Sequence, residues 1–137
     1  MVEHAPARIL VVDDDAAIRV TLDALLHHQG YAVATAANGE EALAWLMQSS
    51  FDLLLIDPQL PGISAREVAQ CAQQCQPAAR IVALAESGDC NGIPITDQVG
   101  QFEYMLKSDN SQEVVELVAA VLDHQHVLNW QLDRRAH

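Results

Sequence analysis

The sequence predicts an α/β fold in which a doubly wound, five-stranded parallel sheet of order 2-1-3-4-5 carries helices on both faces. Two observations lead to this prediction. Short apolar segments alternate along the chain with longer segments of helical periodicity. The apolar segments are hydrophobic at consecutive positions, which is typical of strands that are buried on both faces of a parallel sheet.

The expected strands are the five apolar segments at residues 9–12, 31–35, 53–56, 81–85 and 104–106. The first expected helix follows the acidic run at 13–15, repeats apolar residues from Ile18 to Leu26, and ends at Gly30. The second begins at the Asn38-Gly39 turn. Ser64, with Glu67 three residues later, forms the capping box of the third helix, and the last helix begins near Ser111.

Composition narrows the class of protein. The chain has 137 residues, half of them apolar, which is enough for one globular domain with a single core. A formal charge of −12 disfavours direct nucleic acid binding. No apolar stretch is long enough for a membrane span and the first residues do not resemble an export signal, so we expect a cytoplasmic protein. The three cysteines predict neither a metal site nor a disulfide.

The expected boundaries are an N-terminal tail (1–7), a globular domain (8–123) and a C-terminal helical extension or linker (124–137). Heptad spacing crosses the second boundary at Val114, Val118, Val121, Gln125, Leu128 and Leu132. One interpretation is a continuous helix whose end contacts a second copy of the chain or a downstream module. The other is a frayed tail, because the extension is only about two heptads long.

Carboxylates follow two of the expected strands. Asp13 and Asp14 follow the first strand and Asp57 follows the third, while the only lysine, Lys107, follows the fifth. Neighbouring parallel strands bring their carboxyl ends to one edge, so we expect these groups to converge there. Clustered carboxylates suit Mg²⁺. The simpler alternatives are turn formation by Asp57 and helix capping by the acidic run.

The segments "ILVVDDD", "DLLLIDPQLPG" and "YMLK", at their mutual spacings, resemble the receiver domain of bacterial two-component response regulators, which has a flavodoxin-like fold. The resemblance implies that Asp57 accepts a phosphoryl group from a histidine kinase or phosphotransfer protein. It also implies Mg²⁺ ligation by Asp13, Asp14, Asp57 and the Gln59 carbonyl. Lys107 is similar to the lysine that contacts the phosphoryl group, and Tyr104 resembles the aromatic switch residue.

Three positions depart from the family pattern. Ala85 stands where receivers carry a threonine or serine whose hydroxyl bonds the phosphoryl group, and Ser108 replaces the proline after the lysine. Pro58 removes a backbone donor beside Asp57. In addition, residues 87–100 fall where a fourth helix is expected, yet they contain helix-breaking glycines and a proline. The usual threonine–tyrosine switch is therefore not expected to operate in its ordinary form.

Two classes of function remain open from the sequence. The first is a phosphoacceptor that catalyses only its own phosphorylation and dephosphorylation and switches contacts with an effector domain or protein. The second is a receiver-like interaction module that works without regulated phosphorylation. A Mg²⁺-dependent phosphatase is a weaker third class, because Pro58 and Gln59 follow Asp57 instead of a second acid two residues on. The sequence does not specify kinase, output, pathway or oligomeric state.

Overall fold

The computed structural model describes residues 6–85, 104–107 and 111–122, and for residues 85, 104–107 and 111 it describes the backbone alone. Within these residues, five parallel strands form one sheet of order β2-β1-β3-β4-β5, which confirms the predicted fold class and strand order. The strands are β1 (Arg8–Val12), β2 (Ala32–Ala36), β3 (Leu53–Ile56), β4 (Arg80–Ala85) and β5 (Tyr104–Lys107). The helices are α1 (Ala16–His28), α2 (Gly39–Gln48), α3 (Ala65–Cys75) and α4 (Ser111–Leu122).

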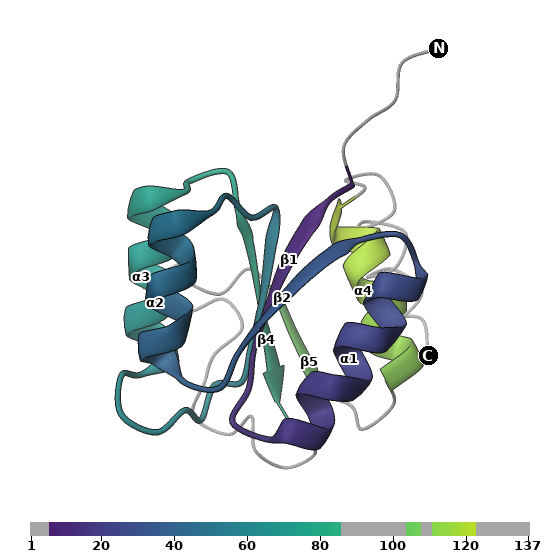
Figure 1. Ribbon diagram of the computed structural model, residues 1–137, viewed down its shortest axis with the longest axis horizontal. Coiled ribbons are helices and arrows are strands. Elements are labelled where there is room, and N and C mark those ends of the chain that lie inside the picture. Colours follow the sequence, from purple (N-terminus) through teal and green to yellow (C-terminus); the bar gives the residue numbers. More distant parts are fainter. Residues whose placement is uncertain (1–5, 86–103, 108–110, 123–137) are drawn as a thin grey trace.

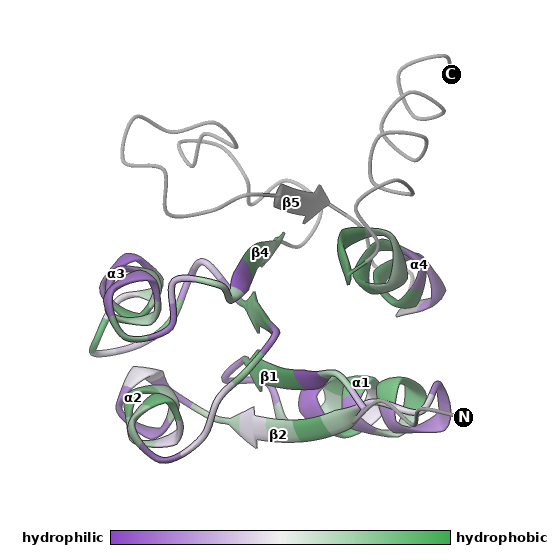
Figure 2. Ribbon diagram, turned by 90° about the horizontal axis from the view of Figure 1, so that it is seen from above, coloured by the Kyte–Doolittle hydropathy of each residue, from purple (hydrophilic) through white to green (hydrophobic). Residues whose placement is uncertain are grey.

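The helices cover both faces of the sheet, with α2 and α3 on one side and α1 and α4 on the other (Figures 1 and 2). Successive strand residues divide between two apolar clusters, because side chains alternate across a strand. In β3, for example, Leu54 belongs to the cluster under α2 and α3, whereas Leu53 and Leu55 belong to the cluster under α1 and α4. All four residues of β3 are at most 1% exposed, which explains why this strand is apolar at every position.

Side-chain caps determine where the helices begin. The Asp15 carboxylate accepts hydrogen bonds from the backbone N–H groups of Ala17 and Ile18 at the start of α1. Asn38 caps α2 and Ser64 caps α3 in the same way, so both predicted helix starts are confirmed. Beyond α1 the chain turns at Gly30, whose φ of +100° favours glycine.

The amide of Gln76 ties the end of α3 to the segment between α2 and β3. Its Oε1 accepts the Phe51 N–H at 2.7 Å, while its Nε2 donates to the carbonyls of Leu46 (3.0 Å) and Ser49 (2.7 Å). One side chain thus satisfies three backbone groups that no strand or helix pairs. This contact holds α2, β3 and α3 in their mutual positions.

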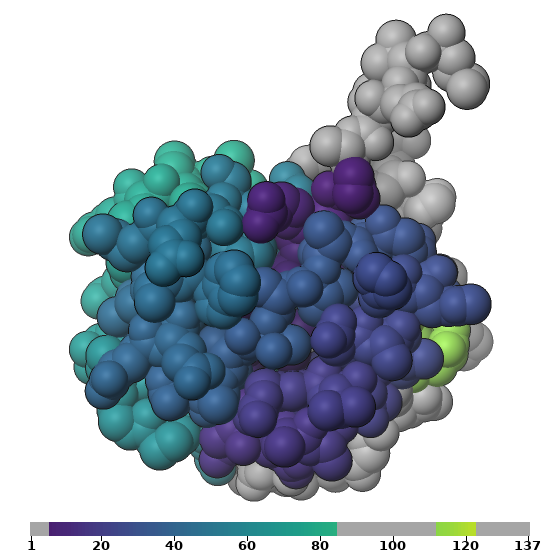
Figure 3. All heavy atoms as spheres, viewed as in Figure 1, coloured from purple at the N-terminus to yellow at the C-terminus, as the bar shows by residue number. Residues whose placement is uncertain are grey.

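Helix α2 also approaches the loop before α3 closely. A Cβ added to Gly39, the first residue of α2, would lie 2.7 Å from the Ile63 carbonyl oxygen, so only glycine fits there. Figure 3 shows one outer face of the molecule, on which α1, β2 and α2 are prominent and α3 lies at the edge. This close approach restrains the loop between Asp57 and α3, since Ile63 belongs to that loop.

Helix α4 packs on the sheet as the heptad pattern predicts for its first half, with Val114, Val118 and Val121 buried in the cluster shared with α1. Gln125, Leu128 and Leu132 of the same pattern lie outside the described residues, as do residues 87–100 and Ser108. Among the helices that the structure describes, none combines the length and hydrophobicity needed to cross a lipid bilayer.

Candidate functional site

The sheet places two aspartates at one edge by extending its hydrogen bonding a residue beyond the strands. The Asp57 N–H donates to the carbonyl of Val12 at 2.8 Å, and the Asp13 N–H donates to that of Ala36 at 3.1 Å. Both residues are therefore held by backbone contacts with the neighbouring strand. Their positions follow from the buried strands behind them, which are β1 and β3.

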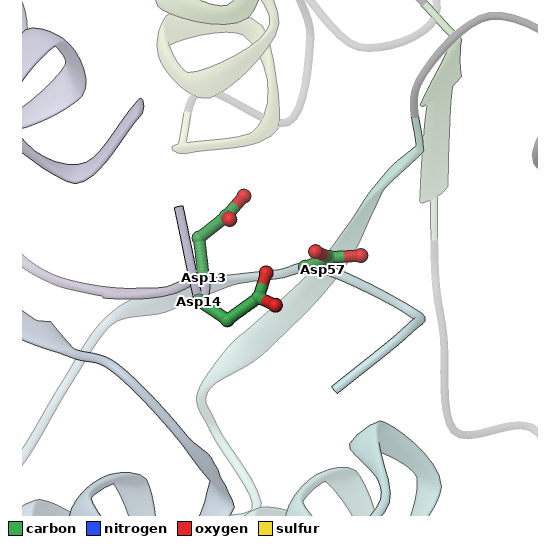
Figure 4. Close-up of side chains that lie close together, drawn as sticks. All are labelled: Asp13, Asp14 and Asp57. Carbon is green, nitrogen blue, oxygen red and sulfur yellow. The ribbon is translucent and has the colours of Figure 1, made fainter. Parts of the chain in front are cut away.

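Asp13, Asp14 and Asp57 converge at this edge, as the sequence predicts. Oxygen atoms of the three carboxylates all lie within 4.8 Å of one another (Figure 4). Asp13 is only 4% exposed and is the one buried polar or charged residue of the described part of the chain. Asp57 is half-buried and Asp14 is exposed. The site thus has a buried inner wall and one side open to solvent.

Backbone donors orient two of the carboxylates. The Asp13 Oδ1 accepts the Asp15 N–H at 2.8 Å, and the Asp57 Oδ1 accepts the Gln59 N–H at 2.8 Å. The second contact is a local turn of the kind that aspartate commonly makes. Asp57 therefore forms the turn after β3 and also belongs to the carboxylate cluster, so the two interpretations of this residue are compatible.

Arg19 is a contributor that sequence reasoning missed. From the first turns of α1, its Nη1 donates to the Asp13 carbonyl at 2.8 Å, which fastens the backbone of the acidic run to the helix. The contact brings a positive charge close to the run, although the guanidinium bonds the backbone instead of a carboxylate. The only signal in the sequence is an arginine one turn into a helix that follows three acids, and that signal is too general to predict the contact.

The three aspartates of the acidic run have different roles. Asp15 caps α1, whereas Asp13 and Asp14 belong to the cluster at the sheet edge. Three carboxylates this close repel one another, and hard oxygen-ligated cations such as Mg²⁺ or Ca²⁺ relieve that repulsion. The donor set is composed of oxygen atoms and includes a deeply buried carboxylate, so it fits a hard divalent cation.

The other predicted site residues are Gln59, Lys107 and Tyr104, and the backbone gives the positions of the last two. Gln59 is exposed in the turn after Asp57. Lys107 ends β5 and pairs in register with Ala85 at the end of β4, while Tyr104 begins β5. The register places Met105 level with Ile56, so Lys107 lies two residues beyond Ile56 in the direction of the site. Their strands thus end at the same edge as the carboxylates.

Comparison with known proteins agrees with this architecture. The family model for the response regulator receiver domain matches residues 9–119. The transcriptional regulatory protein ResD of Bacillus subtilis is 34% identical over 115 residues, which cover 84% of this chain and 48% of ResD. The DNA-binding transcriptional regulator NtrC of Salmonella typhimurium is 31% identical over 85% of this chain, but the match covers only 25% of NtrC. The chain thus spans half or less of these relatives' lengths.

Solved structures give the same answer. The response regulator TrrA of Thermotoga maritima, determined in complex with Mg²⁺ and BeF, has a TM-score of 0.69 at 36% identity; the match covers 82% of this chain and 96% of TrrA. The receiver family model covers residues 9–119, and the strand order β2-β1-β3-β4-β5 is that of the flavodoxin-like fold. This chain belongs to the response regulator receiver domain family of two-component systems.

Proposed function

We propose that Asp57 accepts a phosphoryl group from the phosphohistidine of a sensor histidine kinase or a phosphotransfer protein. The observation that carries this proposal is the half-buried Asp57 carboxylate, which lies within 4.8 Å of those of Asp13 and Asp14 at the carboxyl end of the sheet. Membership of the receiver family supports it. The domain that does this work is residues 8–123.

The residues that would hold Mg²⁺ are Asp13, Asp14, Asp57 and the backbone carbonyl of Gln59. All four supply oxygen ligands, and the related TrrA was solved with Mg²⁺ and BeF. When bound, Mg²⁺ neutralises charge on the phosphoryl oxygens and reduces repulsion between an incoming phosphate and the carboxylates.

The chain itself supplies the nucleophile and its position. An oxygen of Asp57 donates an electron pair to phosphorus, the P–N bond of the donor breaks, and the imidazole leaves. The hydrogen bond from the Gln59 N–H to Asp57 holds that carboxylate in one orientation during attack. We assign to Lys107 the pairing of its ammonium with a phosphoryl oxygen. The product is an acyl phosphate whose lability makes the signal reversible, with the protein catalysing only its own phosphorylation and dephosphorylation.

Intact mass spectrometry tests the proposal. Incubation with acetyl phosphate and Mg²⁺ should add one phosphoryl group of about 80 Da to the wild-type chain. Asp57→Asn should show no gain, whereas Asp23→Asn, an exposed aspartate on α1, should behave as wild type. Labelling that persists in Asp57→Asn would contradict the assignment of Asp57.

Ala85 favours a second candidate, a receiver-like interaction module that works by contact without regulated phosphorylation. Alanine has no hydroxyl to bond a phosphoryl oxygen, so one contact that would distinguish the two states is missing. Under this alternative, the spectral changes caused by beryllofluoride and Mg²⁺ should be small in the wild type and larger in Ala85→Thr. Equal and extensive changes in both proteins would argue against a weakened switch.

We propose that the output is a change in contact with an effector domain or protein, and that residues 124–137 join the receiver to it or to a second copy of this chain. The burial of Val114, Val118 and Val121 on α4 supports this, because the heptad pattern continues from that helix into the extension. Sedimentation of the full chain against a version ending at His124 tests self-association. A dimer that is lost on truncation favours the second copy, whereas monomers in both favour a linker.

A further inference from the structure

Two cysteines, Cys71 and Cys75, face each other on the last turn of α3. They are four residues apart, which places them on the same side of the helix, and their Sγ atoms lie 3.7 Å apart. Cys71 is half-buried and Cys75 is exposed. A small ion can therefore reach both sulfur atoms from solvent without displacing the core.

The separation of the sulfur atoms fits a shared cation better than a direct bond. Two thiolates on a tetrahedral Zn²⁺, each about 2.3 Å from the metal, are about 3.8 Å apart. A disulfide instead needs Cβ atoms about 3.5–4.5 Å apart. Cβ atoms one helical turn apart are separated by about 5–6 Å, so forming that bond would require the turn to unwind. A cation would fit the pair with α3 intact.

A cation that binds the pair must displace the thiol protons. Burial raises the pKa of the Cys71 thiol, and the hydrogen bond and charge of Cys75 raise it further. Two neighbouring thiolates repel each other in the same way as the carboxylates at the sheet edge, and a bound cation removes that repulsion.

We propose that Cys71 and Cys75 together chelate a thiophilic divalent cation with a tetrahedral preference, of which Zn²⁺ and Cd²⁺ are the type. Each S–H bond breaks, its proton passes to solvent, and each sulfur forms one bond to the metal, with water completing the coordination. No oxidation or reduction occurs. This site is separate from the carboxylate cluster, since thiolates select soft or borderline cations and carboxylates select hard ones.

Cadmium titration of the full chain tests the proposal. All proteins carry Cys90→Ser, which removes the third cysteine, and excess Mg²⁺ competes for the carboxylates. The parent protein should develop a thiolate-to-cadmium charge-transfer absorption that saturates at one equivalent of Cd²⁺. Cys71→Ser and Cys75→Ser should each weaken binding at least about tenfold, because losing a ligand costs more than losing a second-shell partner. Circular dichroism confirms that each variant is folded.

Three results would overturn the proposal: no absorption at stoichiometric Cd²⁺, an unchanged titration in either serine variant, or saturation at half an equivalent. The last would mean that one cation joins cysteines of two chains. A second readout is the melting temperature, which Cd²⁺ should raise in the parent and leave unchanged in the double variant Cys71→Ser, Cys75→Ser, because the sulfur atoms are held together only while α3 is folded.

Discussion

Replacing Asp57 by asparagine should stabilise the protein when divalent cations are absent. The substitution removes one of three negative charges that lie within 4.8 Å of one another and preserves the shape of the side chain. Asparagine keeps the Oδ1 atom that accepts the Gln59 N–H, so the turn after β3 stays intact. The change therefore isolates the electrostatic contribution of the charge.

The expected magnitude follows from the spacing. Two unit charges 4.8 Å apart repel by about 1 kcal/mol in a water-like environment and by about 3 kcal/mol at an effective dielectric constant near 20. Asp57 is half-buried, and the Asp13 and Asp57 carboxylates each accept a backbone N–H, which offsets part of the repulsion. We therefore expect a gain of about 1–2 kcal/mol in the free energy of unfolding.

Urea denaturation, followed by circular dichroism with a chelator present, measures this gain. In excess Mg²⁺, the same experiment should give a smaller gain or a loss. Binding stabilises the native wild type more than the variant, since the variant lacks one ligand. Asp23→Asn, an exposed aspartate away from the cluster, controls for the change in net charge. Two results would contradict this prediction. One is an Asp57→Asn variant that is no more stable than wild type in chelator. The other is a stability difference between variant and wild type that Mg²⁺ does not change.

Other parts of the structure give predictions that urea or pH titration can check. Gln76→Ala should lower the free energy of unfolding by about 2–4 kcal/mol, since three hydrogen bonds to backbone groups are lost; the exposed Gln74→Ala is its control, and equal effects would contradict the assigned role. Gly39→Ala should destabilise by about 1–3 kcal/mol despite the higher helix propensity of alanine, because its Cβ would meet the Ile63 carbonyl; a more stable variant would contradict this close approach. Burial raises the pKa of Tyr31 in the folded protein above 10.0. The contribution of Tyr31 to the free energy of unfolding is therefore fully present below pH 10 and is lost as the pH rises through the pKa of the folded protein. Tyr31→Phe should flatten that dependence, and an unchanged profile would contradict it.

The sheet was predictable because the physical signal in each strand is strong. The consecutive apolar residues of β3, Leu53 to Ile56, can be buried only with helices on both faces, and the two apolar clusters confirm that arrangement. Each predicted strand was found within about a residue at either end, which is the ordinary scatter of such boundaries. The helix starts at the Asn38-Gly39 turn and at the Ser64 cap were also predictable, since the side chains of Asn38 and Ser64 bond local backbone groups.

The carboxylate cluster was predictable for a different reason. Asp13 and Asp57 directly follow neighbouring parallel strands, so topology alone brings them together. The sequence predicted Asp13 and Asp14 as members of the cluster, but it did not identify Asp15 as the cap of α1, since all three residues of the run have the same chemistry. The long-range contacts of Gln76 leave no local pattern in the sequence, and the signal for the Arg19 contact is too general to predict it.

The most direct test of the account is to locate the phosphoryl group. Borohydride reduces an aspartyl phosphate to homoserine, so chain treated with acetyl phosphate and Mg²⁺ can be reduced, digested and sequenced by tandem mass spectrometry. Homoserine at position 57, absent when Mg²⁺ is replaced by a chelator and absent from Asp57→Asn, is the result that the account requires. Homoserine at position 13 or 14, or none in a chain that has gained the mass of a phosphoryl group, would contradict it.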